Sequence, residues 1–219
     1  MAGLVVAMDG PSGSGKSSAS RGVARALGLR YLDTGAQYRA MTWWILRQGV
    51  DLADSATIAA RCGEPEIVSG TDPDSPAIHV GAVDVAGPIR EDEVTSAVSA
   101  VAAVPEVRAR LVALQREIIG AGDIVVEGRD IGTVVAPRRP PVKIYLTASP
   151  EARARRRSAE LAGTTAEAQQ AALARRDTLD STRKTDPLSM ADGAVELDTT
   201  ALNLDEVIAE VLRLVKERT

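Results

Sequence analysis

Residues 4–18 read LVVAMDGPSGSGKSS, and this stretch decides the fold. The apolar run at 4–8 predicts a buried strand, and residues 17–27 predict a helix. The residues between them have the spacing G-x-x-x-x-G-K-[ST], which is typical of a loop that binds nucleotide phosphates. A turn of this kind without a ligand is the weaker interpretation, because the spacing and its strand–helix context occur together.

The chemistry of a phosphate site explains the residue types in this loop. Its glycines allow positive φ angles, so that backbone N–H groups and the positive helix end can surround an anion. Lys16 would reach the β- and γ-phosphates of ATP, and the Ser17 hydroxyl would bind Mg²⁺. Asp9 is a candidate to hold a metal-bound water. The residues expected to bind the ATP phosphates are Gly10, Pro11, Ser12, Gly13, Ser14, Gly15, Lys16, Ser17 and Ser18.

The composition argues against several other classes of protein. A net charge of −4 disfavours a nucleic-acid or membrane-surface binder, since either needs a basic face. Aromatic residues make up 2% of the chain, so no surface for stacking bases is predicted. Cys62 is the one cysteine, which excludes an internal disulfide, and His79 is expected to be a strand residue rather than a catalytic base. Without a secretion signal or an apolar run of membrane-spanning length, a cytoplasmic protein is expected.

Apolar strands alternate with helical segments along the chain. The segments that read as main strands are 4–8, 30–32, 123–127, 142–146 and 194–198. This alternation predicts an α/β fold of the P-loop NTPase type, with a five-stranded parallel sheet and helices on both faces, in a single domain of 219 residues. Residues 63–87 are rich in Gly, Pro and Asp and contain short alternating segments, which predict a small inserted antiparallel sheet.

Further basic residues follow the predicted strands. In DTGAQYR, residues 33–39, Thr34 and Gln37 have the spacing of a helix capping box, and Arg39 lies in the first turn, where the helix dipole favours acids. Arg129 follows the third strand, and the helical segments after the fourth strand carry more basic than acidic residues. A solvated basic face would explain the charge of those segments. Beside an ATP site, however, these arginines favour phosphoryl transfer to a second nucleotide.

Several motifs resemble those of the bacterial cytidylate kinase family. They are the loop at 10–18, DTGAQYR at 33–39, VTSAVSAVAAVPEVR at 94–108, VVEGRDIGTVV at 125–135 and DSTRKTDPL at 180–188. The resemblance extends in order over nearly the whole chain, and the small sheet at 63–87 matches the long bacterial form. It implies a P-loop domain with a nucleoside monophosphate (NMP)-binding region at 36–120 and a lid at 150–186 that closes over the substrates.

The same resemblance implies roles for individual residues. Ser99, Arg108 and Asp130 are expected to read cytosine, because an exocyclic amine needs acceptors while N3 and O2 need donors. The other implied acceptor-site residues are Thr34, Tyr38, Arg39, Gly128 and Arg129, with Arg176, Asp180 and Arg183 from the lid. The expected catalytic residues are Lys16, Arg129, Arg176 and Arg183. The resemblance therefore implies phosphorylation of CMP and dCMP by ATP.

Two alternatives remain open at the level of the sequence. The phosphate loop says nothing about the acceptor, so a kinase for UMP, AMP or shikimate would share it. A regulatory nucleotide switch would share it as well, although no NKxD guanine motif is present and the arginines fit a second substrate. The expected partners are small molecules only, without nucleic acid or membrane, and a monomer is expected.

Overall fold

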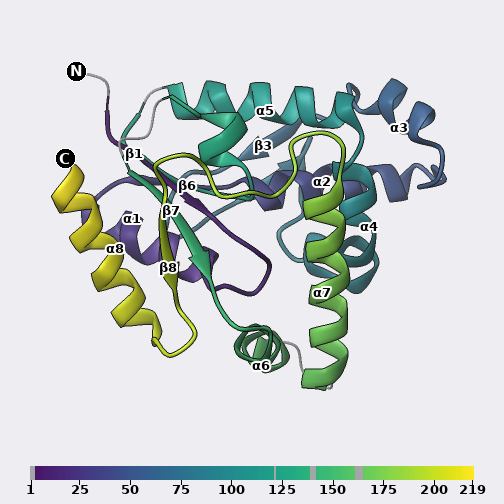
Figure 1. Ribbon diagram of the computed structural model, residues 1–219. Coiled ribbons are helices and arrows are strands. Elements are labelled where there is room, and N and C mark those ends of the chain that lie inside the picture. Colours follow the sequence, from purple (N-terminus) through teal and green to yellow (C-terminus); the bar gives the residue numbers. More distant parts are fainter. Residues whose placement is uncertain (1–2, 121, 139–141, 161–164) are drawn as a thin grey trace.

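The computed structural model describes residues 3–120, 122–138, 142–160 and 165–219 (Figure 1). Its centre is a five-stranded sheet with the order β2-β6-β1-β7-β8, in which every neighbouring pair is parallel. The strands are β1 (Val5–Asp9), β2 (Arg30–Asp33), β6 (Ile124–Glu127), β7 (Val142–Thr147) and β8 (Val195–Asp198). All five had been predicted, and the α/β fold class is confirmed.

Alternate side chains of β1 explain why helices cover both faces of the sheet. Val6 and Met8 belong to a buried cluster with α1 (Lys16–Leu27) and α8 (Leu204–Arg218). Val5 and Ala7 face the other way and pack with α5 (Pro105–Gly120) and the π-helical turn after β6 (Ile131–Val135). Figure 1 shows α5 along the top of the molecule and α8 at the lower left. The carboxyl end of β1 therefore emerges between two covered faces.

The chain between β2 and β6 forms an apolar core of its own. Its elements are α2 (Thr34–Arg47), α3 (Ser55–Arg61), β3 (Ile67–Ser69), β4 (Ile78–Val80), β5 (Val83–Asp84), a 3₁₀ turn (Pro88–Arg90), α4 (Asp92–Ala102) and α5. The three short strands pair antiparallel in the order β3-β4-β5, as predicted for residues 63–87, and His79 lies in β4. Met41, Ile45 and Ile58 are fully buried in this core, which fixes α2 relative to the small sheet.

Two further helices, α6 (Pro150–Glu160) and α7 (Ala166–Thr182), pack against each other after β7. α7 also contacts α4, so it links α6 to the apolar core between β2 and β6 (Figure 1). Residues 161–164, which fall within the expected lid, lie outside the described residues. None of the helices in the described ranges has the length and apolar character needed to cross a membrane.

One local prediction is wrong. The N-cap of α2 is Asp33, whose carboxylate accepts from the backbone N–H of Ala36 at 2.9 Å. Thr34 Oγ1 instead donates to the carbonyl of Glu127 at 2.7 Å, and Gln37 Nε2 donates to Ser69 Oγ at 3.0 Å. The pair that was expected to form a capping box is therefore used for tertiary contacts. The short helix α3 was not predicted.

Candidate active site

One cavity of about 880 Å³ opens at the carboxyl ends of the central strands. It is lined by the expected ATP-binding residues from Ser12 to Ser18, whereas Gly10 and Pro11 lie outside its lining. The predicted acceptor residues in its lining are Thr34, Tyr38, Arg39, Ser99, Arg108, Gly128, Arg129, Asp130, Arg176, Asp180 and Arg183. Residues of α1, α2, α4, α5 and α7 and of the segment after β6, far apart in the sequence, therefore face the same space.

The loop after β1 has the backbone of a phosphate cradle. Gly10, Gly13 and Gly15 have φ of 143°, 77° and 88°, values that residues with a side chain rarely adopt. A Cβ on Gly10 would lie 2.1 Å from the carbonyl oxygen of Leu146 in β7. Only glycine therefore fits at this position. The amino end of α1 follows directly, and its partial positive charge favours an anion in the loop.

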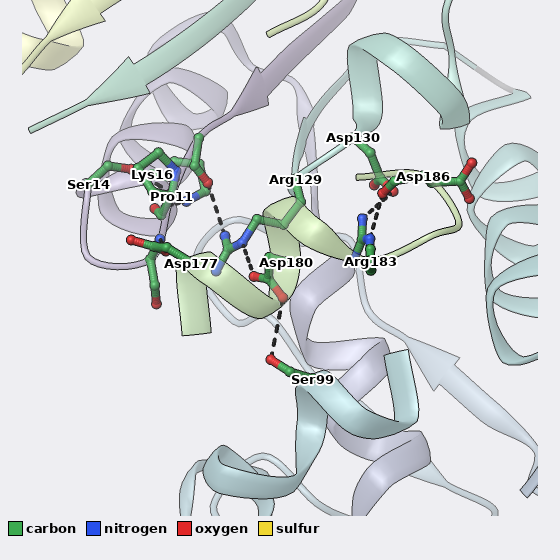
Figure 2. Close-up of polar contacts among 12 residues, drawn as sticks. Pro11, Ser14, Lys16, Ser99, Arg129, Asp130, Asp177, Asp180, Arg183 and Asp186 are labelled. Atoms are coloured by element: carbon green, nitrogen blue, oxygen red, sulfur yellow. Dashed lines mark hydrogen bonds and ion pairs between the residues drawn. The ribbon is translucent and has the colours of Figure 1, made fainter. Parts of the chain in front are cut away.

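Lys16 lies inside this loop with neutral hydrogen-bond partners. Its Nζ donates to the carbonyl of Pro11 at 2.7 Å and to Ser14 Oγ at 3.4 Å (Figure 2). Burial lowers the pKa of Lys16, and the neighbouring Arg129 lowers it further. Nearby phosphates would stabilise the ammonium form and offset both effects.

The carboxylate beside Ser17 belongs to Glu127, at the end of β6. Ser17 Oγ donates to Glu127 Oε2 at 2.9 Å, and the buried Tyr31 hydroxyl donates to the other oxygen. Burial raises the pKa of Glu127. A hydroxyl and a carboxylate at the mouth of the phosphate loop are hard oxygen donors of the kind that Mg²⁺ prefers, so these residues fit that ion.

Asp9 is placed differently from the expectation. Its two carboxylate oxygens accept the backbone N–H groups of Ile131 and Gly132 at 2.9 and 2.8 Å. Burial raises its pKa to about 6, and the two backbone hydrogen bonds act in the opposite direction. Asp9 therefore anchors the turn after β6 to β1.

Two arginines of the cavity lining, Arg39 and Arg176, form no ion pair with a carboxylate of the described residues, unlike Arg129, which pairs with Asp180. Arg39 Nη1 donates to the carbonyl of Ile89 at 3.0 Å and to Thr95 Oγ1 at 2.8 Å, and burial lowers its pKa to about 10. Burial, together with nearby arginines, lowers the pKa of Arg176 to about 9, and the buried Nε of Arg176 has no hydrogen-bond partner among the described residues. We name Lys16, Arg39 and Arg176 the phosphate end of the cavity. Clustered cations with mainly neutral partners favour the binding of an anion.

The opposite end of the cavity holds cations that are already paired. Arg108 is 2% exposed and donates to Asp130 and, through Nε at 2.7 Å, to Asp186. Arg183 Nη2 also donates to Asp130 at 3.1 Å, and Arg183 Nε donates to the carbonyl of Asp186 at 2.5 Å (Figure 2). The Arg108 guanidinium lies 5.6 Å from the centre of the Tyr38 ring. We name Arg108, Asp130 and Arg183 the base end of the cavity.

Asp180 holds three segments of the cavity wall together. It accepts from Arg129 Nε at 3.0 Å and from Ser99 Oγ at 3.3 Å, so that α7, α4 and the segment after β6 meet at one carboxylate (Figure 2). Arg129 Nη1 continues to the carbonyl of Gly10 at 3.1 Å. Gly128 lies close to Thr34, because a Cβ at Gly128 would lie 2.8 Å from the Thr34 hydroxyl.

Sequence reasoning missed three residues at or behind this cavity. Glu127 begins the EGRD motif and Asp186 lies inside DSTRKTDPL, so both were quoted without a role. Arg156 of α6 donates to Thr199 Oγ1 at 2.9 Å and lines the cavity beyond Gly15. Of these three residues, only Glu127 could have been predicted from the sequence, because it lies at the carboxyl end of a predicted strand, where ligands bind in such sheets.

A phosphate cradle that faces further arginines across one cavity defines a P-loop phosphotransferase with an anionic acceptor. Comparison with known sequences gives the family. The family profile described as cytidylate kinase matches residues 6–217. The chain therefore belongs to the cytidylate kinase family.

Individual relatives are similar over nearly their whole length. The chain is 58% identical to a cytidylate kinase of Streptomyces avermitilis over 98% of this chain and 94% of the relative, and 61% identical to that of Streptomyces coelicolor with the same coverage. The chain is 53% identical to a cytidylate kinase of Mycobacterium leprae, over 100% of this chain and 98% of the relative. Among solved structures, a gluconokinase from Sinorhizobium meliloti superposes with a TM-score of 0.51 at 16% identity, covering 99% of this chain and 94% of that one. That similarity supports the P-loop kinase fold alone.

Proposed function

We propose that this protein transfers the γ-phosphoryl group of ATP to CMP and dCMP. The observation that carries the proposal is a single cavity with a phosphate cradle on one side and the Arg108–Asp130 pair on the other. In a member of the cytidylate kinase family, this pair would offer the acceptor base a hydrogen-bond donor and a hydrogen-bond acceptor. CDP, dCDP and ADP are the expected products.

Cations of both ends, together with Arg129, would supply position and charge for the transfer. Lys16 would bind the transferring phosphoryl oxygens, and Arg39 and Arg129 would bind the acceptor phosphate, so that the attacking oxygen lies in line with the bond to be broken. Arg176 and Arg183 come from the expected lid and would add donors as charge develops between the two nucleotides. Little covalent chemistry is required of the protein.

Ser17 and Glu127 are the residues that would hold Mg²⁺. When bound, the ion would supply positive charge that offsets the negative charge of the ATP phosphates. The Ser17 hydroxyl would bind it directly, and Glu127 orients that hydroxyl through the hydrogen bond between them. No cluster of three or more His, Cys, Asp or Glu able to hold a metal occurs among the described residues, which suits an ion held mainly by substrate phosphates.

The base end would select cytosine. Asp130 and the Ser99 hydroxyl would accept hydrogen bonds from the exocyclic amine, while Arg108 would donate to N3 and O2. UMP offers a carbonyl where the amine is expected and an N–H where N3 should accept. Each polar group left unpaired costs about 1–3 kcal/mol, so UMP is expected to be a poor acceptor.

A coupled assay for ADP formation with CMP, dCMP, UMP, AMP and shikimate tests the proposal. CMP and dCMP should have kcat/KM at least about tenfold above the others, a difference of about 1.4 kcal/mol. A preference for UMP or AMP would overturn the base assignment. Nucleotide binding without turnover on any acceptor would favour a regulatory nucleotide switch instead of a kinase.

We also propose that the enzyme acts as a cytoplasmic monomer. Light scattering of the purified protein tests the oligomeric state.

A further inference from the structure

Asp186 lies just after α7, on the side of Arg108 away from the cavity. It contacts the Arg108 guanidinium directly, yet it does not belong to the cavity lining, whereas Arg108, Asp130 and Arg183 do. Its side chain is 28% exposed, whereas that of Arg108, 2.7 Å away, is 2% exposed. Asp186 is therefore placed to act on a substrate only through Arg108.

The backbone holds Asp186 in a defined conformation. Its φ is 51°, in the left-handed region that Asp adopts more readily than most residues. Its carbonyl accepts from Arg183 Nε at 2.5 Å, and the N–H of Leu188 donates to the carbonyl of Asp180 at 2.8 Å. The segment that closes α7 thus presents the carboxylate to Arg108 from a turn that is fixed at both ends.

The hydrogen-bond inventory of Arg108 shows what this contact does. A guanidinium has five N–H donors in one plane. Nε is taken by Asp186, and Nη2 donates to Asp130. With Nε and Nη2 both bonded to carboxylates, the plane of the group is set, and three N–H donors of the two Nη groups remain for a ligand.

Charge leads to the same conclusion. Asp130 accepts from both Arg108 and Arg183 through Oδ2, so one carboxylate is shared between two buried cations. When Asp130 turns toward a bound base, Arg108 would lose part of its only other charged partner. Asp186 supplies a second carboxylate that keeps the Arg108 cation paired in both situations.

We propose that Asp186 is a positioning residue for base recognition, which orients Arg108 toward the acceptor base and keeps it paired during binding. This inference rests on the proposed function. Because Asp186 belongs to the segment that ends the expected lid and Arg108 belongs to α5, the contact also links the lid to base selection.

Two variants test the role of the side chain. Asp186→Ala removes the acceptor and the charge, and Asp186→Asn keeps an oxygen that can still accept from Arg108 Nε. Asp192→Asn is the matched control, because Asp192 is an exposed aspartate in the same connection to β8. The measurements are the Kd for CMP by titration calorimetry, kcat/KM for CMP and UMP, KM for ATP and thermal unfolding.

Asp186→Ala should weaken CMP binding about tenfold and lower the preference for CMP over UMP about tenfold, with KM for ATP within twofold of the unaltered protein. Asp186→Asn should weaken CMP binding and lower the CMP/UMP preference about threefold. Asp192→Asn should change neither. A CMP Kd and a CMP/UMP preference equal to those of Asp192→Asn would overturn the inference, as would an equal loss of ATP and CMP affinity. If Asp186→Ala does not fold, the CMP/UMP preference of Asp186→Asn decides in the same way. Failure of the unaltered protein to phosphorylate CMP would instead reject the proposed function.

Discussion

The two ends of the cavity hold similar numbers of cations but treat them differently. At the phosphate end, Lys16 and Arg39 donate hydrogen bonds to neutral carbonyl and hydroxyl groups. At the base end, Arg108 and Arg183 donate to the carboxylate of Asp130. A cation that donates its hydrogen bonds to neutral groups can still attract an anionic ligand, whereas a cation bonded to a carboxylate is held in place for directional hydrogen bonds. The contrast suggests that the phosphate end captures a nucleotide and the base end selects it.

The largest effect is expected at Lys16, whose charge lies closest to the transferring group. Lys16→Ala should lower kcat about 10²- to 10³-fold, because a preorganised charge that acts on the transition state is lost. Steady-state kinetics with ATP and CMP measures this, and thermal unfolding checks that the fold survives. Turnover near that of the unaltered protein would show that Lys16 does not act in phosphoryl transfer. It would also weaken the distinction between the two ends of the cavity.

Stability should respond in opposite ways at the two ends. Arg108→Ala leaves the buried carboxylate of Asp130 short of a partner and should cost about 3–5 kcal/mol of unfolding free energy. Arg176→Ala removes a cation that burial and neighbouring arginines already disfavour, so the unfolding free energy should be unchanged or higher while kcat falls. Urea unfolding of both variants without ligand measures the contrast. An equal loss of stability in the two would contradict it.

Asp180 offers the smallest and most specific effect, at the sugar. We expect Asp180→Ala to weaken the binding of CMP about threefold more than the binding of dCMP. A carboxylate can accept a hydrogen bond from the ribose 2′-hydroxyl, which dCMP lacks. Both nucleotides should also lose affinity in common, since Arg129 and Ser99 lose their shared partner. KM for the two acceptors measures the difference, and identical ratios in the variant and the unaltered protein would confine Asp180 to a structural role.

The phosphate cradle could be predicted in detail from the sequence because its residues are consecutive. Within residues 10–18 the glycines, lysine and serine are tied to one another by chain connectivity, so spacing alone implies their geometry. β1 and β6 were predicted for a related reason, since buried parallel strands are short apolar runs between turns. The spatial order of the five strands was not predicted, because pairing depends on tertiary contacts.

The base end could be only partly predicted, because its residues come from α5, from the end of β6 and from the segment after α7. The resemblance to a family indicated Arg108 and Asp130, but nothing local in the sequence indicates that Asp186 reaches Arg108. The capping box failed for a similar reason. The Thr34 hydroxyl donates a hydrogen bond to the carbonyl of Glu127 in β6, which is distant in the sequence. Asp33 therefore caps the helix instead.

The ionic-strength dependence of acceptor use tests the division between capture and selection most directly. KM for CMP and for UMP should be measured from about 0.05 to 0.5 M salt, a range over which screening increases strongly. Both KM values should rise together, because phosphate capture depends on charge that salt screens. The ratio of kcat/KM for CMP to that for UMP should stay constant, because base selection depends on short hydrogen bonds between groups that are already paired. A ratio that falls with salt, or KM values that do not change, would contradict the account.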